Sequence, residues 1–187
     1  MIPIYYVISN ELYHHGIKGQ KWGVRRFQNE DGSLTAKGEK RYNRNKKHIE
    51  QEIAIHENQI KQERSQARLY TKSANDIKKT GKTTLDAEYG NSLSESEKAK
   101  TLRITAGRRE YNAAALKAAA KGREWYINEL KKLDVSTMSS MKLNVRMAQL
   151  AHEGQQHAKK YFEDSIAKNQ NISEYTDYTS THVYPYP

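Results

Sequence analysis

Two weakly apolar heptad patterns constrain the fold of this chain more than any other feature. In residues 36–79, which contain no proline, apolar and small residues recur at spacings of four and three, and Glu63 fills one expected apolar position. A second pattern in residues 95–133 is interrupted by Arg109 and Arg123. Such spacing is typical of long helices that pair along a seam. The two sets are Ile49, Ile53, His56, Ile60, Ala67, Tyr70, Ala74 and Ile77, and Leu102, Ala106, Ala113, Leu116, Ala120, Ile127 and Leu130.

Capping and turn residues predict where these helices begin. Asp31-Gly32 indicates a turn, and Ser33 or Thr35 can cap the first helix. Ser94 followed by Glu97 matches a capping box for the second helix, after a linker near residues 80–94. A third helix is expected over residues 138–168. Its apolar side is predicted to carry Leu143, Met147, Leu150, Tyr161 and Phe162.

The predicted fold is mainly α. A small N-terminal element rich in glycine and aromatic residues, with a short strand in residues 1–9, precedes two or three long helices that form a hairpin or small bundle. Three regions are expected: a docking element (1–42), a basic helical region (43–168) and a Tyr-rich flexible tail (169–187). Leu, Ile, Val and Phe total 31 residues against a net charge of +10, which argues against a compact globule. Homo-oligomers that form through the seams remain an open alternative. No apolar run is long enough to span a membrane, so no membrane partner is expected.

Residues 13–35 are unlike an amphipathic helix. Three glycines at spacings of three and four free the backbone, and Trp22 and Phe27 can anchor an apolar cluster. The basic side chains can meet an acidic partner. The candidate docking residues are His14, His15, Lys18, Lys21, Trp22, Arg25, Arg26 and Phe27.

This segment, HHGIKGQKWGVRRFQN followed by DGSLT and then by Gly38, Arg41 and Tyr42, resembles a block found in phages and prophages of Gram-positive bacteria. There the block is attached to diverse head-region proteins: portal-linked, scaffold-like and minor capsid proteins. The match covers about residues 13–42, and Ala36 stands where the family often has proline, which favours an earlier helix start. The resemblance implies a virion or prohead context and no catalytic role.

A second candidate surface lies in the opening turns of the first helix. Six cations within eleven residues can contact phosphates or an acidic protein, although their side chains should point around most of the helix. A solvated surface with surplus charge is the alternative interpretation. The residues are Lys37, Lys40, Arg41, Arg44, Lys46 and Lys47.

Histidines give little support for catalysis. His14 and His15 lack a neighbouring nucleophile, and His152 and His157, five residues apart, cannot share one metal on a regular helix. We therefore expect no enzyme activity, cofactor or metal. The leading hypothesis is a non-enzymatic phage protein that docks on head proteins, acts in the host cytoplasm during assembly and enters the virion if it stays bound. The alternatives are a basic DNA- or RNA-binding accessory protein, or an inhibitor of host defence, acting in the infected cytoplasm.

Overall fold

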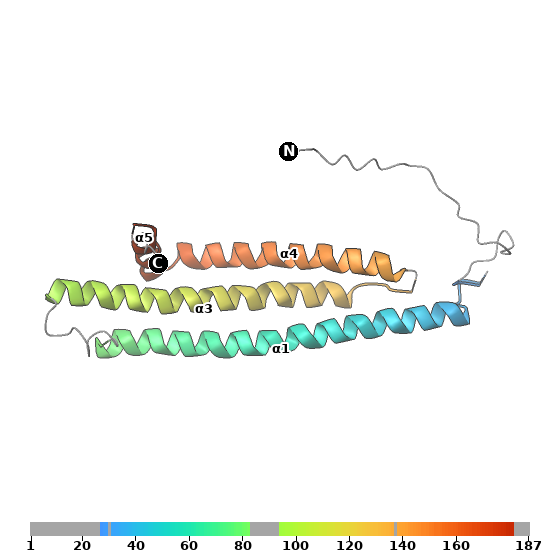
Figure 1. Ribbon diagram of the computed structural model, residues 1–187, viewed down its shortest axis with the longest axis horizontal. Helices are drawn as coiled ribbons and strands as arrows, with labels where there is room; N and C mark the ends of the chain where they lie inside the picture. Colours follow the sequence, from blue (N-terminus) through green and yellow to red (C-terminus); the bar gives the residue numbers. More distant parts are fainter. Residues whose placement is uncertain (1–26, 30, 83–93, 137, 182–187) are drawn as a thin grey trace, which may run out of the picture.

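The computed structural model describes residues 27–29, 31–82, 94–136 and 138–181, and it confirms the mainly α fold. The helices are α1 (Ala36–Thr80), α3 (Glu95–Lys131), α4 (Ser140–Ala167) and α5 (Gln170–Thr181). The strand predicted in residues 1–9 lies outside the described residues. Figure 1 shows α1, α3 and α4 side by side with alternating direction and α3 in the middle, so the molecule is a rod of antiparallel helices. None of these helices is long and apolar enough to cross a membrane.

The predicted helix starts are confirmed by their caps. The Thr35 hydroxyl oxygen accepts a hydrogen bond from an amide of the first turn of α1, which begins at Ala36. The reciprocal bonds of Ser94 and Glu97 open α3, and Ser139 caps α4. Each cap satisfies backbone donors that a helix leaves unpaired at its N-terminus. Gly81, with a left-handed φ of 63°, ends α1 at the start of the predicted linker.

The two predicted heptad seams pack against each other within the chain. Ala67 and Ala74 of α1 are fully buried, and Ala113 and Ala120 of α3 are nearly so. Two of the three charged residues that interrupt the patterns are also partners, because Arg123 Nε donates to Glu63 Oε1 over 2.9 Å. Both seams are therefore used in an intramolecular hairpin.

The hydrophobic core is concentrated at one end of the rod, where α1, α3 and α4 all meet. Its buried members come from α1, the last turns of α3, the α3–α4 connection and α4. Toward the other end, the contact between α1 and α3 narrows to a seam of alanines. The core residues are Ile49, Tyr126, Leu130, Val135, Leu143, Met147 and Leu150.

Helix α3 approaches α4 most closely at a pair of glycines. A Cβ added at Gly122 would lie 2.5 Å from the carbonyl oxygen of Gly154, and one added at Gly154 would lie 2.9 Å from the carbonyl oxygen of Gly122. Neither distance is tolerable for a real side chain. The two helices can therefore pack at this spacing only because both positions lack a Cβ.

Most of the segment predicted to be a flexible tail (169–187) is helical, and residues 182–187 lie outside the described residues. Residues 170–181 form α5, which packs on α3 with Ile172 only 2% exposed. The Tyr111 ring of α3 meets the rings of Phe162 and Tyr175 edge-on at 5.1 and 5.6 Å. One isoleucine and scattered tyrosines were too sparse a pattern to reveal this contact. Tyr161, predicted on the apolar side of the third helix, is 40% exposed.

We expect Gly122→Ala to lower the free energy of unfolding by about 1–3 kcal/mol, because overpacking at the helix contact exceeds the gain in helix propensity. Urea denaturation followed by circular dichroism measures this loss. Asn128→Ala, on the exposed side of the same helix, is the control and should be neutral or slightly stabilising. Equal stability of the two variants would contradict a close α3–α4 contact.

Candidate docking end of the helical rod

The Asp31-Gly32 turn closes a small hairpin directly before α1. Gln28 and Leu34 form an antiparallel bridge, and Gly32 has a φ of 86°, in the left-handed region that favours glycine. The Asp31 carboxylate accepts hydrogen bonds from the hydroxyl and the backbone N–H of Ser33, and these bonds lower the pKa of Asp31. The predicted turn is confirmed and holds the end of the N-terminal block against the start of the helix.

Phe27 folds back onto the first two turns of α1. Its carbonyl oxygen accepts a hydrogen bond from the backbone N–H of Thr35 over 3.1 Å. A Cβ at Gly38 would lie 2.1 Å from that same oxygen, so only glycine permits this approach. The Arg41 guanidinium carbon lies 3.9 Å from the centroid of the Phe27 ring, a cation–π contact. Three separated residues of the block therefore meet in one place.

The connection between α3 and α4 is bound to the same turns of α1. Arg41 donates to the carbonyl oxygen of Ser136 over 3.4 Å, and Arg44 donates to the Ser140 hydroxyl over 2.6 Å. Asn45 is 2% exposed; it donates to the carbonyl oxygen of Met138 over 2.9 Å and accepts from the Ser140 hydroxyl over 3.1 Å. We call residues 27–45 together with 134–140 the docking end.

The structure describes only one of the predicted docking residues of the block, Phe27; the others, from His14 to Arg26, lie outside the described residues.

The basic patch divides into two groups. Arg41 and Arg44 make the internal contacts given above. Lys37, Lys40, Lys46 and Lys47 are exposed, and no ion pair is found for these four lysines among the described residues. Those four are therefore available to an external partner.

Asn45 is a residue that sequence reasoning missed. It lies four positions before Ile49, one helical turn earlier on the same face of the helix, which is the signal that could have found it. Its burial is tolerated because both ends of its amide are hydrogen-bonded to the α3–α4 connection. The asparagine thereby aligns α1 with that connection.

A second polar cluster lies midway along the rod, in a groove of about 290 Å³ where α1, α3 and α4 come together. His56 Nδ1 is 3.0 Å from an Arg123 nitrogen, and its ring meets the Tyr126 ring edge-on at 4.9 Å. Burial, and next the positive charge of Arg123, lower the pKa of His56. Because arginine can only donate, Nδ1 accepts and the ring is held neutral.

The two histidines of α4 are placed on the helix as expected. The His157 ring stacks on Trp125 with centroids 4.5 Å apart, and His152 is exposed. Over residues 27–29, 31–82, 94–136 and 138–181, no three His, Cys, Asp or Glu side chains gather in a group that could hold a metal ion.

Comparison with known proteins gives one match. Residues 7–29 match the model of a family of unknown function (DUF7211). The matched segment includes most of the N-terminal block and ends at Asn29, inside the hairpin that packs on α1. No curated protein and no solved structure matches the chain.

Arg41→Ala should lower the free energy of unfolding by about 1–2 kcal/mol, because it removes a cation–π contact and a hydrogen bond. Chemical denaturation measures the change. Lys40→Ala, an adjacent exposed position, should stay within about 0.5 kcal/mol of the parent protein. Indistinguishable variants would show that the Phe27–Arg41 contact does not stabilise the docking end.

Acidification should destabilise the protein through His56. Since its pKa is lower in the folded chain than in the unfolded chain, the unfolded chain binds more protons just below the ordinary histidine pKa of 6.5. The melting temperature should therefore fall between about pH 7.5 and 5.5, and His56→Gln should reduce this fall. His152→Gln, at an exposed histidine, should leave it unchanged. An identical pH dependence in both variants would contradict the assignment to His56.

Proposed function

We propose that this protein is a non-enzymatic phage head-associated or head-assembly protein that docks on a head component through its N-terminal block. The supporting observation is that residues of the block far apart in sequence, Phe27, Gly38 and Arg41, meet in one contact at the docking end. A block whose separated residues form one contact is a structural unit. Its sequence resembles the block attached to diverse phage head proteins.

The helices act as a spacer in this proposal. At 1.5 Å per residue, residues 46–80 of α1 extend about 52 Å beyond the docking end. The hydrophobic core and the hydrogen bonds of Asn45 and Arg44 are concentrated at the docking end. They would therefore fix the orientation of the rod relative to the docked block. The partner would be a head protein with an acidic surface facing the basic residues of the block. The site of action would be the host cytoplasm during assembly.

Trp22→Ala tests the docking role, since a large aromatic ring is the expected anchor of an interface. The variant should disappear from gradient-purified precursor heads and particles of the parent phage, as measured by mass spectrometry, while circular dichroism stays unchanged. Tyr161→Ala, at an exposed aromatic residue of α4, is the control and should co-purify normally. Full retention of Trp22→Ala, or absence of the parent protein from both fractions, would contradict the proposal.

A further inference from the structure

Ion pairs join α1 to α3 in a regular ladder along one side of the hairpin. From one pair to the next, the position in α1 advances by seven or by fourteen residues and the position in α3 goes back by the same number, as expected for antiparallel helices in heptad register. In this register, Thr71 of α1 lies opposite Lys117 of α3, so one step of the ladder has no carboxylate. The pairs are Glu57–Lys131, Arg64–Glu124 and Lys78–Glu110.

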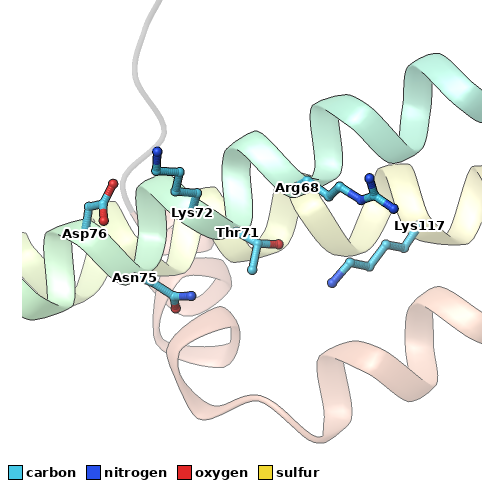
Figure 2. Close-up of a pocket in the computed structure, with 6 residues that line it drawn as sticks. All are labelled: Arg68, Thr71, Lys72, Asn75, Asp76 and Lys117. Carbon is cyan, nitrogen blue, oxygen red and sulfur yellow. The ribbon is translucent and has the colours of Figure 1, made fainter.

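Cations gather where the ladder is interrupted. Arg68 and Lys72 of α1 and Lys117 of α3 line a hollow of about 470 Å³ with Thr71, Asn75 and Asp76. Figure 2 shows Lys117 near Arg68 and Thr71, whereas Asp76 lies at the opposite end of the group. Within the described part of the chain, none of the three cations makes an ion pair or a hydrogen bond. Asp76 is the one carboxylate lining the hollow, which leaves an uncompensated positive charge.

The neutral side chains of the hollow differ in the hydrogen-bonding groups that they present to it. The Thr71 hydroxyl donates to the Ala67 carbonyl oxygen over 2.8 Å, so its oxygen presents lone pairs to the hollow. The Asn75 amide can donate. An anion between α1 and α3 would therefore meet donors on Arg68, Lys117 and Asn75, and it would relieve the repulsion between cations on two packed helices.

The same side of α1 carries further exposed cations. Lys61, Arg68, Lys72 and Lys79 are spaced by seven, four and seven residues, which aligns them along one face of a helix. The track is about 27 Å long at 1.5 Å per residue, and no ion pair neutralises its members among residues 27–29, 31–82, 94–136 and 138–181. A single small anion would occupy the hollow alone, whereas a linear polyanion would contact the whole track.

We propose that this side of the α1–α3 hairpin binds the phosphate backbone of a nucleic acid. Arg68 and Lys117 contact one phosphate from two helices, and Lys61, Lys72 and Lys79 contact its neighbours. These contacts position a chain of phosphates and read no base sequence. The site lies on the helical hairpin, away from the docking end, so it does not depend on the proposed docking role.

Lys117→Glu is the sharpest test, because it adds the missing carboxylate to the ladder. The variant should fold with an equal or higher melting temperature, since a carboxylate would replace one of the cations in the hollow that Arg68 also lines. Its affinity for a short fluorescein-labelled DNA duplex, measured by anisotropy on the full chain, should fall about tenfold, and the salt slope should decrease by about one.

Lys160→Glu is the control with the same change in net charge, at an exposed position of α4. Its affinity should fall less than about threefold, because Lys160 lies on α4, which contributes no residue to the hollow or to the track, and salt weakens its effect on a phosphate bound there. Equal losses in both variants, or no binding by the parent protein at low salt, would overturn the proposal. Displacement of the duplex by inorganic phosphate at constant ionic strength would also overturn it, since the hollow would then be a small-anion site. Measuring whether these variants co-purify with heads tests the docking role independently of duplex binding, so the failure of one proposal can be distinguished from the failure of the other.

Discussion

The whole structure depends on the close packing of two helices, α1 and α4, against two sides of α3. One side of α3 packs on α1 through Ala113 and Ala120, and another packs on α4 through Gly122. Small side chains permit short distances between helix axes, and those distances restore the dispersion contacts that a chain with few large apolar residues otherwise lacks. Because α1 and α4 hardly touch each other, their relative placement is set by α3.

Polar contacts supply the specificity that a thin apolar seam cannot. A seam of alanines would tolerate sliding of one helix along another, since alanines in successive heptads are alike. Asn45, hydrogen-bonded to the α3–α4 connection, and the Glu63–Arg123 pair in the seam each match only one register. Removing one partner of such a buried contact leaves an unsatisfied group, which penalises the wrong alignment more than it stabilises the correct one.

The two sides of the hairpin differ in how far their positive charges are compensated by carboxylates. On the side of the groove, Arg123 is compensated by Glu63, and its charge helps to keep His56 neutral. On the side of the ladder, Lys117, Arg68 and Lys72 line one hollow with a single carboxylate, that of Asp76. Like charges brought near each other on two packed helices weaken folding unless an anion compensates them. The net charge of +10 is therefore unevenly distributed over this rod.

The sequence by itself determined α1, α3 and α4, because heptad spacing, Thr35, Ser94 and Gly81 act over one or two turns. It also indicated the hairpin turn at Asp31-Gly32. What it could not determine were contacts between residues far apart: the pairing of Glu63 with Arg123, the contact of Gly122 with Gly154, and the packing of α5. The Arg68–Lys117 hollow is of the same kind, since each cation alone is a common surface residue. Only the antiparallel register of α1 and α3, set by packing along their whole length, brought these residues together.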